Sequence, residues 1–197
     1  MNSLEILKNI SKKHNGIILT STAIINGLTR SNLSKLCKKG IITRIANGQY
    51  VLTEELDDEL LSMQLRSKKI IFSHETALFL LGISDRTPFE HSITISTSKS
   101  VSTIMRNECK VYHIKDELYD MGKVELITPM GNKVWAYDME RTICDIVRNR
   151  KRISDETFIS AIKNYAANPK KNLINLSMYA SKMNILSKIR KYLEVLL

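Results

Sequence analysis

The apolar positions of residues 4–38 recur at helical spacing and predict three short helices. In the first, leucine and isoleucine side chains form one stripe, and lysines occupy the opposite face. The second is expected over residues 21–26, with Thr20 as its N-cap and a glycine after its last turn. The third is expected to follow a cap at Thr29 or Ser31. Because its apolar side chains share one face, its basic side chains are expected to face solvent.

Two β-prone runs, residues 41–46 and 49–52, follow the third helix and are joined by Asn47-Gly48, the strongest short-range signal for a hairpin. A helix, a tight turn, a basic helix and a β-ribbon form a winged helix-turn-helix, which places one helix in the major groove and the ribbon on the phosphate backbone. We therefore predict this motif over residues 16–52. Winged helices also serve as protein-protein modules, and a basic face can simply be solvated, so these alternatives stay open.

Several polar side chains on the third helix and the hairpin are suited to contact duplex DNA. Base edges require bidentate partners, which Arg30, Asn32 and Gln49 can provide, whereas phosphates require positive charge or hydroxyl groups. The predicted DNA-binding residues are Thr29, Arg30, Ser31, Asn32, Lys35, Lys38, Lys39, Arg44, Asn47 and Gln49.

The charge distribution favours a polyanionic partner for the N-terminal domain. Residues 1–52 hold eight Lys or Arg and one acidic residue, a net charge of +7. Residues 53–135 have a net charge of −3 and residues 136–197 a net charge of +6, which together recover the +10 of the chain. A positive field concentrated on one small domain attracts nucleic acid more effectively than an evenly spread excess.

The residues after the hairpin indicate a connecting helix and then a second domain. Thr53 is expected to cap a helix that begins at Glu54 and packs through Leu56, and the polar cluster 66–69 closes this helix. We place the domain boundary there. The predicted domains are therefore a winged helix-turn-helix domain with its connecting helix over 1–69 and an α+β domain over 70–197.

Alternating apolar positions in the second domain predict β-strands, and helical spacing returns after them. An apolar run over 70–72 leads into a helix, and strands are expected over 92–96, 110–114, 125–128 and 133–137, with a short crossover helix within 101–107. From Asp138 to the end, the spacing predicts four helices. A small mixed or antiparallel sheet of about four strands, packed with several helices, is the α+β pattern.

The chain carries no motif that predicts an enzyme, a cofactor or a metal site. The cysteines are odd in number and widely spaced, and we interpret them as small buried residues in a reducing compartment: Cys37, Cys109 and Cys144. One alternative is a nuclease of restriction type, in which Asp85, Glu108 and Lys110 would hold a magnesium ion and activate water.

Two charged segments of the second domain need an interpretation. The densest basic cluster lies between two predicted helices and consists of Arg148, Arg150, Lys151 and Arg152. Cations near a helix C-terminus complement the helix dipole, and the same cluster is a candidate contact for DNA or a partner protein. In the segment 138–145, Glu140 and Arg141 occupy a first helical turn, where they are expected to cap the helix and to stay solvated.

The composition is that of an ordinary globular protein, with 43% hydrophobic residues in a chain of 197. No run of about 18 apolar residues occurs, and the first residues lack the order of a signal peptide. We therefore expect a cytoplasmic protein without membrane contact.

Two segments of the second domain, together with the N-terminal motif, resemble a known family. Residues 73–88 read Ser-His-Glu-Thr-Ala-Leu-Phe-Leu-Leu-Gly-Ile-Ser-Asp-Arg-Thr-Pro, and residues 138–145 read Asp-Met-Glu-Arg-Thr-Ile-Cys-Asp. With the winged helix they make nearly the whole chain similar to the AbiEi family of abortive-infection antitoxins. The resemblance implies a type IV toxin-antitoxin system in bacterial phage defence.

The resemblance also implies roles for the two domains. The winged helix would bind inverted-repeat operator DNA and repress the chain's own operon, as a monomer able to bind DNA cooperatively. The C-terminal domain would counter a cognate nucleotidyltransferase toxin, with direct contact between the two proteins left open, and the Arg148–Arg152 cluster is its candidate antitoxin surface. The main alternative is a ligand-sensing winged-helix repressor, which an apolar pocket with convergent polar groups in the second domain would indicate.

Overall fold

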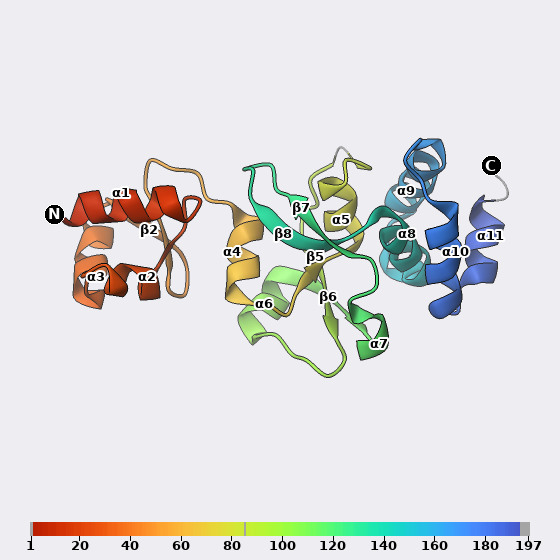
Figure 1. The fold of residues 1–197 in the computed structure, drawn as a ribbon, viewed down its shortest axis with the longest axis horizontal. Coiled ribbons are helices and arrows are strands. Elements are labelled where there is room, and N and C mark those ends of the chain that lie inside the picture. Colours follow the sequence, from red (N-terminus) through yellow and green to blue (C-terminus); the bar gives the residue numbers. More distant parts are fainter. Residues whose placement is uncertain (1, 85, 194–197) are drawn as a thin grey trace. The chain divides into compact units, whose positions relative to one another are not determined.

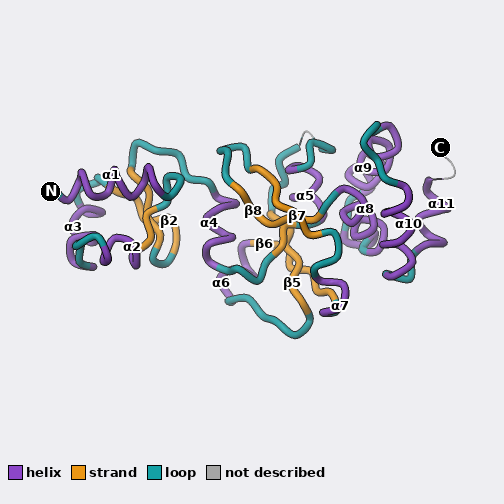
Figure 2. Tube along the Cα trace, viewed as in Figure 1, coloured by secondary structure: helices purple, strands orange, loops and turns teal. Residues whose placement is uncertain are grey.

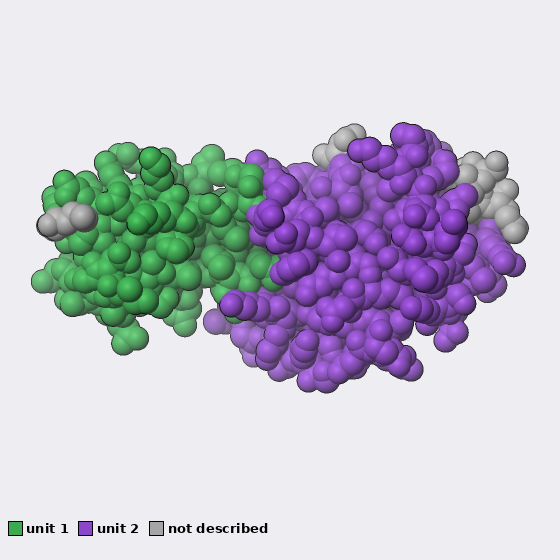
Figure 3. All heavy atoms as spheres, in the orientation of Figure 1, with its two compact units in different colours: residues 1–66, 130–132 green, residues 67–129, 133–197 purple. Residues whose placement is uncertain are grey.

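The computed structural model describes residues 2–84 and 86–193 and divides into two compact units. Unit 1 comprises residues 1–66 and 130–132, and unit 2 comprises residues 67–129 and 133–197 (Figure 3). Figure 2 shows the strands in two separate groups, a small sheet in unit 1 and a larger one in unit 2. The prediction of an α+β fold is confirmed.

Unit 1 combines short helices with a three-stranded antiparallel sheet of strand order β1-β3-β2 (Figure 1). Its elements are α1 (Ser3–Lys13), β1 (Ile18–Leu19), α2 (Thr20–Ile25), α3 (Arg30–Lys38), β2 (Ile42–Ala46), β3 (Gln49–Leu52) and α4 (Glu59–Arg66). The core is formed by Leu7, Ile10, Ile18, Ala23, Leu28, Leu33, Ile42 and Leu52. The predicted order of three helices and a hairpin is present, and β1 is an additional strand that pairs with β3.

The turn of the β2–β3 hairpin is attached to the start of α2. The backbone nitrogen of Thr20 donates to the carbonyl of Gly48 at 2.8 Å, and the Thr20 hydroxyl donates to the same oxygen at 3.2 Å. Thr20 was predicted to be the N-cap of α2, and this prediction is wrong, because β1 leads directly into the helix and Leu19 occupies the cap position. The Thr20 hydroxyl instead binds the turn, in which Gly48 has a φ of +74°.

The connecting helix starts later than predicted. Residues after β3 form a turn, in which Glu55 N donates to Leu52 O at 2.9 Å, and Leu56 is 81% exposed. Helix α4 begins at Glu59, and the Asp58 carboxylate caps it by accepting from Leu61 N at 3.0 Å. Asp58 also accepts from the amide of Asn132 at 2.8 Å. The predicted cap at Thr53 is therefore wrong. Asp58 caps the helix instead, and Asn132 of the distant segment 130–132 holds its carboxylate in place.

Unit 2 is built on a mixed five-stranded sheet with strand order β6-β5-β4-β8-β7. The strands are β4 (Ile71–Phe72), β5 (His91–Ser96), β6 (Cys109–Ile114), β7 (Lys123–Ile127) and β8 (Lys133–Tyr137). β5 and β6 are parallel and are joined by the predicted crossover helix, α6 (Thr103–Glu108). The fifth strand is β4, which is only two residues long and pairs with β5 and β8.

Helix α8 (Met139–Arg148) is contacted by α5, α9, α10 and α11, whereas α6 and α7 lie elsewhere along the sheet (Figure 1). The others are α5 (His74–Leu80), α7 (Asp116–Tyr119), the 3-10 turn η1 (Arg150–Arg152), α9 (Asp155–Ala167), α10 (Leu173–Lys182) and α11 (Leu186–Leu193). Asp138, Ser154 and Asn172 cap α8, α9 and α10 through their side chains. The predicted fourth helix extended to residue 197, and positions 194–197 lie outside the described residues. None of the described helices has the length and apolar character needed to cross a membrane.

Arg141 is fully buried in the first turns of α8, so the expectation that it stays solvated is wrong. Its Nε donates to both carboxylate oxygens of Asp145 at 3.2 Å, and its Nη1 donates to the carbonyls of Leu118 and Met121 at 2.7 Å. The guanidinium lies 4.1 Å from the centre of the Tyr137 ring. An ion pair and two backbone carbonyls thus offset part of the cost of its burial, and Nη2 is buried without a hydrogen-bond partner among the described residues.

Glu140 is also buried, and its carboxylate binds other parts of unit 2. It accepts from the backbone nitrogen of Asn172 at 2.7 Å and from the Tyr165 hydroxyl at 3.4 Å. The expectation that it stays solvated is therefore wrong too, because α9 and α10 supply its partners.

His74, at the start of α5, is buried as well. It has a φ of +48°, and its ring stacks on Tyr112 with 3.5 Å between centroids. The two ring nitrogens lie within hydrogen-bond distance of the Ser73 hydroxyl and the Asn149 amide. Burial, followed by the positive charges of Arg152 and its cationic neighbours, holds the pKa of His74 well below its usual value of 6.5.

The lowered pKa of His74 predicts a loss of stability toward acid. Below about pH 6.5 the unfolded chain binds a proton at this position and the folded chain does not, so stability falls as the pH decreases. The slope attributable to His74 is at most about 1.4 kcal/mol per pH unit. His74→Asn removes the titrating group and keeps a residue that tolerates a positive φ. In urea denaturation between pH 7.5 and 5, the free energy of unfolding of this variant should therefore decline less steeply than that of the original protein. Parallel curves for the two proteins would contradict the assignment.

Candidate nucleic-acid interface

The start of α3 is defined by a reciprocal cap between two of the predicted DNA-binding residues. The backbone nitrogen of Asn32 donates to the Thr29 hydroxyl at 3.1 Å, and the backbone nitrogen of Thr29 donates to Asn32 Oδ1 at 3.0 Å. The two side chains also contact each other. Asn32 therefore has a structural role that the sequence analysis did not assign, and its Oδ1 is already engaged in the protein without DNA.

The solvent side of α3 carries the predicted cations. Ser31, Lys35 and Lys38 lie at i, i+4 and i+7 and share one face, and all three are exposed. Arg30 and Lys39, at the two ends of the helix, are exposed as well. Leu33 is fully buried on the opposite side, so core packing turns the basic face outward.

The β2–β3 hairpin presents a second cation beside its turn. Arg44 is exposed, and its Nη2 donates to Asn47 Oδ1 at 2.8 Å while its Nε donates to Ala46 O at 3.3 Å. The strand pairing shifts register between Arg44 and Ala46, as in a β-bulge. These contacts hold the guanidinium against the turn and leave its charge at the surface.

Gln49 does not reach the surface, and its prediction as a base-contacting residue is wrong. It is 3% exposed, and its amide donates to Ser62 O at 3.2 Å and accepts from the Ser62 hydroxyl at 2.6 Å. Gln49 and Val51 share one face of β3, opposite the face through which Leu52 joins the core of unit 1, and both are buried. Gln49 thus joins the hairpin to α4.

Replacing Gln49 with alanine is expected to lower the free energy of unfolding by about 1–3 kcal/mol, because the Ser62 groups would lose their buried partner. The salt dependence of DNA binding should stay the same, since no exposed charge changes. Thermal denaturation and a salt titration of DNA affinity measure the two effects. A loss of affinity for operator DNA but not for random DNA, with unaltered stability, would restore Gln49 to the interface.

The basic cluster of unit 2 is partly committed to contacts within the fold. Arg150 donates to Ile153 O at 2.8 Å, pairs with Asp155 and lies 4.4 Å from the centre of the Phe158 ring. Arg152 lies 4.0 Å from the centre of the Tyr112 ring and donates to Val111 O at 3.3 Å. Arg148 and Lys151 are exposed. The structure thus gives Arg150 and Arg152 roles in joining η1 to α9 and β6.

Of the three residues of the nuclease alternative, Glu108 and Lys110 belong to the described part of the chain. Asp85 lies outside the described residues. Glu108 is the exposed last residue of α6, and Lys110 pairs with Glu75, at 3.3 Å. Among residues 2–84 and 86–193, no group of three or more His, Cys, Asp or Glu side chains could hold a metal ion.

The cysteines follow their predicted burial in two of three cases. Cys109 and Cys144 are buried, and burial raises the pKa of the Cys144 thiol well above its usual value. Cys37 is half-exposed on α3, because this position lies at the edge of the helix face that packs on the core.

Comparison with known proteins shows similarity of fold rather than of sequence. No known protein family matches the sequence, and no curated protein matches it significantly. The fold is similar to the crystal structure of the RV2827C protein from Mycobacterium tuberculosis, with a TM-score of 0.71 and 13% sequence identity. The similarity covers 97% of this chain and 79% of that chain. Over almost its whole length, therefore, this chain has the α+β fold of the RV2827C protein.

Proposed function

We propose that this chain is a DNA-binding autorepressor and the antitoxin of a type IV abortive-infection system. The DNA-binding part of the proposal rests on one observation, the exposed cationic face of α3 followed in the chain by a hairpin that exposes Arg44. A helix of this charge, preceded by a short helix and followed by a β-ribbon, is suited to the major groove and its flanking phosphates. The similarity of residues 73–88 and 138–145 to the AbiEi family supports the antitoxin part.

A salt-titrated gel shift tests the DNA-binding part. Full-length protein is incubated with duplex DNA that carries the inverted repeat upstream of its own gene and, in parallel, with random DNA of equal length. We expect tighter binding to the repeat, and an affinity for both that falls linearly with the logarithm of salt concentration. If two copies occupy one repeat, their α3 helices should lie about 34–36 Å apart along the duplex. Equal affinity for both duplexes would contradict operator recognition.

Co-expression tests the antitoxin part. The neighbouring gene should encode a nucleotidyltransferase whose expression alone arrests growth, and unit 2 is the part proposed to counter it. Growth should recover when the full chain is produced together with this toxin. Recovery should persist with Lys35 and Lys38 replaced by alanine, because the two activities are assigned to different units.

A ligand-sensing repressor is the second candidate, and a cavity in unit 2 favours it. The cavity has a volume of about 440 Å³, which lies within the range of small-molecule sites. Its lining is richer in charged and hydroxyl groups than the apolar pocket that the sequence analysis set as the sign of such a repressor. Binding of a ligand that changes operator affinity would favour this candidate over the antitoxin.

A further inference from the structure

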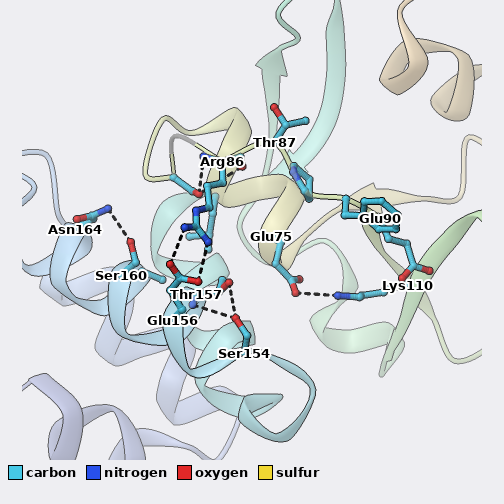
Figure 4. A pocket seen from close by; sticks show the side chains of 15 residues that line it. Glu75, Arg86, Thr87, Glu90, Lys110, Ser154, Glu156, Thr157, Ser160 and Asn164 are labelled. Atoms are coloured by element: carbon cyan, nitrogen blue, oxygen red, sulfur yellow. Dashed lines mark hydrogen bonds and ion pairs between the residues drawn. The ribbon is translucent and has the colours of Figure 1, made fainter.

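The cavity of unit 2 lies between loop residues 84 and 86–90 and helix α9, with α5 and β6 completing its walls (Figure 4). Leu78 and Ala161 give it an apolar part. Hydroxyl and amide side chains of α9 face it from successive turns, namely Thr157, Ser160 and Asn164. The cavity is therefore a mixed polar site, of a size for a molecule comparable to an amino acid or larger.

The charges that line the cavity are unequal. Three carboxylates stand against two cations, a net charge of −1 in a chain whose net charge is +10. Arg86 binds Glu156 through two hydrogen bonds of 2.7 and 2.8 Å, and Figure 4 shows this pair joining the loop to α9. The second cation that lines the cavity, Lys110, forms an ion pair with Glu75, so both cations are paired.

Glu75 has a further partner, because its other oxygen accepts from the Ser92 hydroxyl at 2.9 Å. Glu90 is the remaining carboxylate of the cavity. It is half-buried and makes no hydrogen bond or ion pair with another described residue. A carboxylate without an ion-pair partner among the described residues attracts a positively charged group.

An aromatic ring lies next to this carboxylate in the chain. Phe89 lines the cavity and is fully exposed to solvent. The face of an aromatic ring attracts organic cations through its quadrupole, and a neighbouring carboxylate adds an ion pair. A metal ion is a poorer fit, because the described residues contain no cluster of three metal-binding side chains.

We propose that this cavity is a binding site for a small organic cation that carries an ammonium or guanidinium group. The cationic head lies between the Glu90 carboxylate and the Phe89 ring, and the remainder follows the hydroxyl and amide groups of α9. The site is independent of the DNA-binding face, since all of its lining residues belong to unit 2. The proposal does not depend on the DNA-binding or antitoxin roles, and it names a ligand class for the cavity of the ligand-sensing alternative.

Isothermal titration calorimetry of the full-length chain with agmatine, a dication, tests the proposal, with n-butylurea as a neutral probe that shares its four-carbon chain and planar head group. We expect saturable binding of one agmatine per chain and no measurable binding of butylurea. A chain with net charge +10 repels cations in general, so saturable binding of a cation indicates a defined site. Absence of agmatine binding up to about 10 mM, or equal binding of both probes, would overturn the proposal.

Three variants locate the site, and circular dichroism verifies their folding. Glu90→Gln should weaken agmatine binding about tenfold or more, and Phe89→Leu about two- to fivefold, the size expected for an exposed cation–π contact. Glu117→Gln removes an exposed carboxylate of unit 2 outside the cavity and should leave the affinity unchanged. Unchanged affinity in both cavity variants would overturn the assignment even if agmatine binds.

Discussion

Replacing Arg141 with leucine is expected to lower the free energy of unfolding of unit 2 by about 3–5 kcal/mol. The substitution leaves Asp145 buried without its cation and removes the donors of the Leu118 and Met121 carbonyls. The chain packs closely at this point, since a Cβ added at Gly122 would lie 2.6 Å from Arg141 Cβ. Urea denaturation followed by the fluorescence of Trp135, the single tryptophan, measures the change in unit 2.

Arg148→Leu is the matched control, because it removes the same side chain from an exposed position of the same helix. It should change stability by no more than about 0.5 kcal/mol. Adding Asp145→Leu to Arg141→Leu should restore part of the lost stability, since no buried charge is then left unpaired. Equal effects of the Arg141 and Arg148 variants would show that the buried network contributes no more than a surface arginine.

The second large effect is expected on DNA binding by the double variant with Lys35→Ala and Lys38→Ala. Each lysine is assigned a phosphate contact, so the slope of log affinity against log salt should become shallower by roughly one unit per lysine. The loss should be the same on operator and random DNA, because phosphate contacts carry no sequence information. Fluorescence anisotropy over a series of salt concentrations measures both quantities.

Two further variants distinguish phosphate contacts by Lys35 and Lys38 from contacts with base edges and from a nonspecific effect of removing positive charge. Arg30→Ala should cost about 1–3 kcal/mol on operator DNA and much less on random DNA, since Arg30 is assigned to a base edge. Lys163→Ala removes an exposed charge from α9 of unit 2 and should leave the salt slope unchanged. If Lys163→Ala flattened the slope as much as either α3 variant, the interface would not be confined to unit 1.

The sequence predicted some residues of the candidate DNA interface correctly and misplaced others. Lys35 and Lys38 are exposed as expected, because the amphipathic pattern of a helix specifies its outer face within a few residues. Gln49 was misplaced because its polar amide, on the strand face opposite the core residue Leu52, suggested a surface position. Its burial is favourable because its amide is hydrogen-bonded to Ser62, which lies 13 residues later in α4.

The sequence by itself determined most element types and their order, because caps, glycine turns and apolar periodicity act within a few neighbouring residues. Thr29, Asn47-Gly48 and Ser154 mark boundaries that the structure retains. The tertiary structure decided where buried polar groups find their partners. Asp58 is bound by Asn132, 74 residues away, and Arg141 by the carbonyls of residues 118 and 121, and these pairings decide the start of α4 and the centre of unit 2. A buried charge is stable only beside its partner, and local sequence does not specify which distant residue folding brings there.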